Sequence, residues 1–236
     1  MTSVQTMESV LRVGDTQEIA FAGDGVLLAG QIDYPDKNPP ANGFPLIFIL
    51  HHAGCNTRES YQHYADIGLA CGYAVFRWDK RGTGRSGAGG RGSTTQDAVN
   101  AYEVALEQAR INHNRIVILA QEAGTAMLGN AYGLFARIQQ PFGVILVSNT
   151  LDVNEILAIE SRVLVIAGQK DWNPWQKYAR AACETHNAAY KYGASFYVAP
   201  YGDRSLRDAR HPEQPFHPGA ASVIRDWLES CAVVQR

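Results

Sequence analysis

The chain has 236 residues, of which 46% are hydrophobic and 19% are charged. We therefore expect residues 1–236 to form a single large domain around a sizeable core, with residues 1–15 as a loosely ordered start. A formal net charge of −2 and scattered arginines exclude a dedicated nucleic-acid-binding protein, because no basic stripe exists to neutralise phosphates. No apolar run reaches the roughly 18–20 residues of a membrane helix, and the start does not resemble a secretory signal, so we expect a cytoplasmic protein.

Two alternating segments open the chain. Residues 16–21 and 26–34 alternate between apolar and polar side chains around a glycine-containing turn, which predicts an antiparallel hairpin at the edge of a larger sheet. The segments that follow are continuous apolar runs, typical of strands buried on both faces of a parallel sheet. These runs are residues 46–50, 74–78, 116–120, 144–147, 163–167 and 196–199.

Helical patterns separate several of these strands. Helices are predicted at residues 61–71, 95–109, 124–134 and 220–231, with Thr94 or Thr95 as the cap of the second one. Strands that alternate with helices imply right-handed crossovers and a doubly wound, mostly parallel sheet with helices on both faces, which is an α/β fold. Catalytic or binding groups then belong to the loops at the carboxyl ends of the strands.

Four segments stand at those strand ends. Residues 51–56 begin with His51 and contain small residues, and residues 79–87 form a glycine-laced loop. Residues 120–124 pass abruptly from a strand into a helix, and residues 168–171 end in Asp171. The glycine-laced loop fits neither a Walker motif nor a dinucleotide-binding motif.

In this order and spacing, the four segments resemble the α/β-hydrolase superfamily over about residues 18–229. Residues 51–54 are similar to its HGxG oxyanion loop, residues 79–87 to its D-x-RG-x-G-x-S-G segment, and Asp171 stands where it places the triad acid. The resemblance implies an oxyanion hole made by the backbone N–H groups of Ala53 and Ala123. Residues 210–221 resemble the tail of dienelactone-hydrolase-like members, which are small esterases without a cap.

Two catalytic positions depart from the superfamily pattern. Its G-x-S-x-G elbow holds a serine on a strained turn, and here Glu122 stands in the serine position. The alignment of the tail puts Arg204 in the histidine position, with His211 and His217 as reserves. Because arginine stays protonated and cannot act as a general base, the usual serine chemistry cannot be carried over.

These departures leave two main hypotheses open. In one, Glu122, Arg204 and Asp171 form a charge-assisted cluster that plugs a former active site, and the protein is a pseudo-hydrolase that binds a small ligand or a protein partner. In the other, Glu122 acts as a nucleophile or as a general base on a small ester, lactone or epoxide, or in lyase or isomerase chemistry. An engineered loss of the serine is disfavoured because both positions differ.

The other candidate residues are expected to line the pocket. They are His52, Cys55, Gln121, Trp172 and Trp175. Ser148 is a further hydroxyl near the rim, and nothing in the sequence activates it. Only about fifteen residues separate the strands at 144–147 and 163–167, too few for a helical cap, so we expect a lidless and open site.

Neither a cofactor nor a metal is expected. The chain contains no dinucleotide motif, and its four cysteines lie far apart without histidines at metal-ligand spacing, which indicates reduced thiols. The expected partner is a small-molecule ligand or substrate, with neither nucleic acid nor a membrane. An edge strand or the closing helix could support a homodimer.

Overall fold

The computed structural model describes residues 13–172 and 176–233. Its strands are β1 (Val13–Gly23), β2 (Val26–Pro35), β3 (Phe44–Leu50), β4 (Ala74–Trp78), β5 (Ile111–Gln121), β6 (Gly143–Val147), β7 (Arg162–Gly168) and β8 (Ala194–Ala199). Its helices are the 3-10 turn η1 (Arg58–Tyr61) and the α-helices α1 (Gln62–Ala70), α2 (Thr94–Leu106), α3 (Ala123–Ile138), α4 (Val153–Leu157), α5 (Gln176–Ala189) and α6 (Pro218–Val233).

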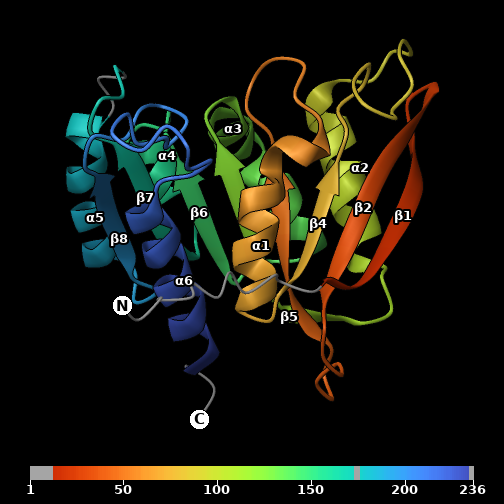
Figure 1. The fold of residues 1–236 in the computed structure, drawn as a ribbon, viewed down its shortest axis with the longest axis horizontal. Coiled ribbons are helices and arrows are strands. Elements are labelled where there is room, and N and C mark those ends of the chain that lie inside the picture. The colour runs from red at the N-terminus through yellow and green to blue at the C-terminus, as the bar shows by residue number, and fades with distance from the viewer. Residues whose placement is uncertain (1–12, 173–175, 234–236) are drawn as a thin grey trace, which may run out of the picture.

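The strands form one sheet in the order β1-β2-β4-β3-β5-β6-β7-β8. The hairpin β1–β2 and the contact of β2 with β4 are antiparallel, and the pairs from β4 to β8 are parallel. Helices α1 and α6 cover one face, whereas α2 and α3 cover the other (Figure 1). The predicted doubly wound α/β architecture, including the edge hairpin, is confirmed.

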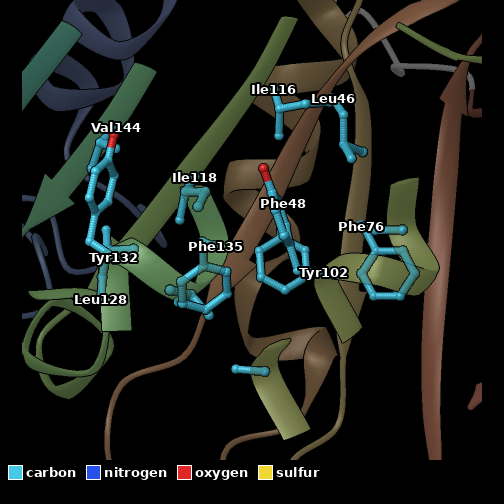
Figure 2. Close-up of a cluster of buried hydrophobic side chains, with 14 of the residues drawn as sticks. Leu46, Phe48, Phe76, Tyr102, Ile116, Ile118, Leu128, Tyr132, Phe135 and Val144 are labelled. Atoms are coloured by element: carbon cyan, nitrogen blue, oxygen red, sulfur yellow. The ribbon is translucent and has the colours of Figure 1, made fainter. Parts of the chain in front are cut away.

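Aromatic side chains fill the core between the sheet and helices α2 and α3. Phe48 of β3 lies at the centre, with ring centroids 5.9 Å from Phe76, 5.2 Å from Tyr102 and 6.4 Å from Phe135 (Figure 2). All four side chains are fully buried. Burying a side chain of this size contributes about 1.5–3 kcal/mol relative to its exposure, so this cluster fixes both helices against the sheet.

Several element boundaries differ from the sequence prediction. Helix α2 is capped by Ser93, whose hydroxyl accepts a hydrogen bond from the Gln96 amide, and neither Thr94 nor Thr95 is the cap. The start predicted to be loosely ordered was residues 1–15, but residues 13–15 belong to strand β1, which begins at Val13 and pairs with β2. Residues 1–12 lie outside the described residues. Helices α4 and α5 were not predicted. Between β6 and β7 the chain forms only the short helix α4, so no cap domain is inserted there.

Candidate functional site

Glu122 occupies a strained elbow between β5 and α3. Its φ angle is +49°, a region that side chains other than glycine rarely adopt. The elbow is held on both sides, because the Glu122 amide donates to the Val147 carbonyl at 2.9 Å and its carbonyl accepts from the Thr125 amide at 2.8 Å. Strain of this kind persists only where the surroundings fix it. The elbow therefore carries the Glu122 side chain at the carboxyl edge of the parallel strands.

Gly124 permits the close approach of α3 to β3 at this elbow. A Cβ on Gly124 would lie 2.6 Å from the Leu50 carbonyl oxygen and 2.7 Å from the His51 carbonyl oxygen. Both obstacles are backbone atoms, which cannot rotate away as a side chain can. Only glycine therefore fits here without moving the start of α3.

We expect Gly124→Ala to lower the free energy of unfolding by about 1–3 kcal/mol, as overpacking of a filled site does. The matched control is Gly133→Ala in the same helix, where an added Cβ meets nothing within 4 Å. That control should raise stability by about 0.5–1 kcal/mol, because alanine favours a helix interior. Urea unfolding measures both, and equal effects of the two variants would contradict the close approach.

Arg204 lies between two carboxylates. Its Nε is 3.1 Å from Oε2 of Glu122, and its Nη1 is 3.3 Å from Oδ1 of Asp171. The side chains of Arg204 and Glu122 are 22% and 16% exposed, and that of Asp171 is 1% exposed. The Trp172 ring covers the guanidinium, with its centroid 4.9 Å from Cζ. The planar fork of arginine suits this contact with two acids and a ring.

Ser148 fixes the loop that carries Arg204. It is fully buried at the end of β6, and its hydroxyl donates a hydrogen bond to the Arg204 carbonyl oxygen. Gly168, at the end of β7, packs against the same loop, since a Cβ there would lie 2.1 Å from the Asp203 carbonyl oxygen. Ser148 is thus a positioning residue for Arg204, a role that its place in the sequence did not reveal.

His52 belongs to a hydrogen-bonded group in the loop after β3. Its Nδ1 lies 2.6 Å from the Tyr61 hydroxyl, and its Nε2 lies 2.6 Å from Nδ2 of Asn56. Because Nδ2 of Asn56 also donates to the Ala53 carbonyl oxygen, the amide is a donor and Nε2 an acceptor. Nδ1 then carries the proton, which describes a neutral imidazole. The ammonium group of Lys80 donates hydrogen bonds to the carbonyl oxygens of His52 and Gly54.

Burial lowers the pKa of His52, and the cations Lys80 and Arg204 lower it further, whereas Glu122 acts in the opposite direction. Burial also raises the pKa of the Tyr61 phenol. Both groups therefore keep their neutral forms near pH 7. Tyr61 and Lys80 were missed by the sequence analysis, because their contacts with the His52 loop join segments that no local pattern connects.

The two reserve histidines have other partners. His211 is half-exposed and lies 3.3 Å from Glu213. His217 is buried at the start of α6, where Nε2 lies 2.9 Å from the Pro200 carbonyl oxygen and Nδ1 accepts from the Ala220 amide. Since the ring nitrogens of His217 both contact the backbone, this side chain caps and anchors α6. Of the three residues weighed for the histidine position, the structure brings Arg204 to Glu122.

The remaining residues predicted for the site differ in their exposure to solvent. Gln121 is buried at the end of β5, and Trp172 is 79% exposed. Cys55 is an exposed free thiol, Ala53 is exposed in the loop after β3, and Ala123 is the first residue of α3. Trp175 lies outside the described residues. The catalytic and oxyanion roles that the resemblance implied for these residues stay predictions.

The described residues offer neither a metal site nor a membrane-spanning helix. Within residues 13–172 and 176–233, no group of three or more His, Cys, Asp or Glu side chains is arranged to hold a metal ion. In the same ranges, no helix has the length and apolar character needed to cross a membrane.

Comparison with known proteins now identifies the family. The model of the family described as serine aminopeptidase, S33, matches residues 45–187, which is more than half of the chain. The chain therefore belongs to this hydrolase family of the α/β-hydrolase superfamily. No curated protein matches the chain in sequence.

Solved structures agree in fold. A putative α/β hydrolase of unknown function from Agrobacterium tumefaciens superposes with a TM-score of 0.72 at 15% identity, over 93% of this chain and 98% of that chain. Est1E from Butyrivibrio proteoclasticus superposes with a TM-score of 0.67 at 14% identity, over 91% of this chain and 98% of that chain. The esterase domain of a Rhodothermus marinus protein also has a TM-score of 0.67 at 14% identity, over 92% of this chain and 98% of that chain. At these identities the similarity concerns the fold alone.

Proposed function

We propose that this hydrolase-family chain binds a small ligand at the carboxyl edge of its sheet without serine-hydrolase chemistry. One observation carries the proposal, the contact of 3.1 Å between Nε of Arg204 and Oε2 of Glu122. The family mechanism needs a hydroxyl nucleophile and a base that takes its proton. Here a carboxylate stands at the elbow, and its partner is a guanidinium that holds its charge at all working pH values.

The same contact argues against Glu122 as a free nucleophile. The ion pair with Arg204 stabilises the negative charge of the carboxylate, which makes its oxygens weaker nucleophiles toward carbon. On the other side of Arg204, Asp171 supplies a second acceptor at 3.3 Å. A ligand that enters this edge would therefore meet the ion cluster of Arg204, Glu122 and Asp171 and the exposed Trp172 ring.

A second candidate function is hydrolysis of a small ester, lactone or epoxide, with Glu122 as a general base on water. The strained φ of +49° at Glu122 favours it, because such strain gathers at functional sites. The tail motif around residues 210–221 adds support for a small substrate of the dienelactone-hydrolase kind. In this reading Glu122 would use the carboxylate oxygen that Arg204 does not contact.

Rates with p-nitrophenyl acetate, dihydrocoumarin and styrene oxide separate the two candidates. We expect the unaltered protein and Glu122→Gln to show equal rates, both at the level of buffer. Cys55→Ser is the control, because an exposed thiol reacts with activated aryl esters. Turnover that survives Cys55→Ser and disappears in Glu122→Gln would overturn the binding proposal and select the hydrolase.

A further inference from the structure

A large hollow lies at the opposite edge of the sheet, at the amino ends of β6, β7 and β8. Its volume is about 1090 Å³. The segments just before these three strands and the first residues of β7 and β8 line it, together with Asn114 of β5 and Ser230 of α6. This edge faces away from the elbow of Glu122, as the run of the strands in Figure 1 shows. Pockets for small organic ligands usually measure about 300–1,000 Å³, so the hollow is large enough to hold one.

Two cations line the hollow. Arg162 opens β7 and Lys191 precedes β8. Neither forms an ion pair with a carboxylate among residues 13–172 and 176–233. Arg162 instead donates from Nη1 to the Cys231 sulfur at 3.3 Å, a weak acceptor. Among the described residues that line the hollow, Glu160 is the one acid, against the two cations Arg162 and Lys191, so this part of the lining carries a net positive charge.

An apolar and aromatic wall completes the hollow. Pro141, Phe142 and Tyr192 line it, and Tyr192 is 49% exposed. The Trp227 ring lies behind this wall, 5.2 Å from the Arg162 guanidinium carbon and against Gly143, where an added Cβ would be 2.6 Å from Cη2. Trp227 is 5% exposed, and its Nε1 has no hydrogen-bond partner within the described part of the chain. The Trp227 indole therefore lies next to the lining residue Arg162, although it does not itself line the hollow.

We propose that this hollow binds a monocarboxylate with an apolar body, such as a medium-chain fatty acid or an aryl acid. The carboxylate would pair with Arg162 and Lys191, since arginine and lysine form their strongest hydrogen bonds with such anions. The apolar body would lie against Phe142 and Tyr192. Glu160 at the rim disfavours a second negative charge, which selects a monoanion over a dianion. This site is separate from the carboxyl edge and from the function proposed there.

The probe for this site is 11-(dansylamino)undecanoate, followed by its fluorescence as it binds the full chain. Octanoate should displace it, whereas octan-1-ol at the same concentration should not, because the alcohol lacks the charge. Lys191→Glu should lower the affinity for the probe by about tenfold, which is the usual effect of losing a charged hydrogen bond. Lys170→Glu is the matched control, since it makes the same charge change at the exposed opposite edge, and it should leave the affinity unchanged.

A second readout locates the bound probe. In ¹H–¹⁵N spectra, the indole signal of Trp227, assigned with Trp227→Phe, should shift as octanoate is added. The signal of Trp78 should not move, because its Nε1 already donates to the Ile49 carbonyl oxygen in the core. Three results would each overturn the proposal. The first is equal displacement of the probe by octanoate and octan-1-ol, and the second is equal affinity for the probe in Lys191→Glu and Lys170→Glu. The third is a Trp227 signal that stays fixed when octanoate saturates the protein.

Discussion

Replacing Arg204 by methionine should lower the free energy of unfolding by about 2–3 kcal/mol. The substitution keeps much of the apolar stem and leaves the Glu122 and Asp171 carboxylates without the cation that lies 3.1 and 3.3 Å from them. Removing one member of a fully buried ion pair costs about 3–5 kcal/mol, and we reduce this figure because Arg204 and Glu122 are 22% and 16% exposed. Urea unfolding at pH 7 measures the loss.

A double-mutant cycle shows how much of that loss belongs to the pair. The loss of unfolding free energy caused by Arg204→Met should be smaller by about 1–2 kcal/mol in the Glu122→Gln background, because no charge at the elbow then remains to be paired. Arg85→Met is the control, because the pair of Arg85 with Glu18 is largely exposed and such pairs contribute about 0–1 kcal/mol. A coupling of zero would mean that the contact contributes nothing to stability.

The free energy of unfolding should fall as the pH is lowered from about 6.5 to 4. Burial lowers the pKa of His51 to about 3 and that of His63 to about 4, from an ordinary value near 6.5. Below about pH 6.5 the unfolded chain binds these protons and the folded chain does not, so stability rises with pH in this window. The contribution is complete above pH 6.5 and is lost on acidification, by on the order of 2–3 kcal/mol for each histidine.

His63→Phe isolates one of these histidines. Phenylalanine keeps the ring between Tyr64 and Phe216, whose centroids lie 4.0 and 4.7 Å from that of His63, and it cannot be protonated. The difference in unfolding free energy between pH 6.5 and 4 should therefore shrink in this variant. An unaltered pH dependence in His63→Phe would refute the assignment.

The strands were predictable because burial on both faces makes them continuous apolar runs. Helix α5 was not predictable in this way, although its buried residues recur at helical spacing. They are Ala179, Ala182, Cys183 and His186. Small or polar side chains give a weak hydrophobic signal, and the burial of His186 depends on a distant contact, the Ile159 carbonyl oxygen at 2.9 Å. Strand β5 likewise begins earlier than predicted, because Ile111 pairs with Phe44 of β3 ahead of a polar stretch that carries no apolar signal.

The candidate site was predictable where it depends on position along the chain. Glu122 was identified by the resemblance of the strand-to-helix passage to the superfamily's elbow, and Arg204 by the alignment of the tail with the superfamily's pattern. The contacts that hold these residues were not predictable. Ser148 and Arg204 are 56 residues apart, and Tyr61 reaches His52 from η1, so only the folded chain brings them together.

We infer that Glu122, Arg204 and Asp171 stand where the family places its triad. Covalent labelling with a fluorophosphonate, located by mass spectrometry, tests it most directly on the combined Glu122→Ser and Arg204→His variant. We expect a label at position 122 of this variant and none at that position in the unaltered protein or in Glu122→Ser alone, because only the histidine could activate the new hydroxyl. A folded double variant that stays unlabelled would contradict the assignment.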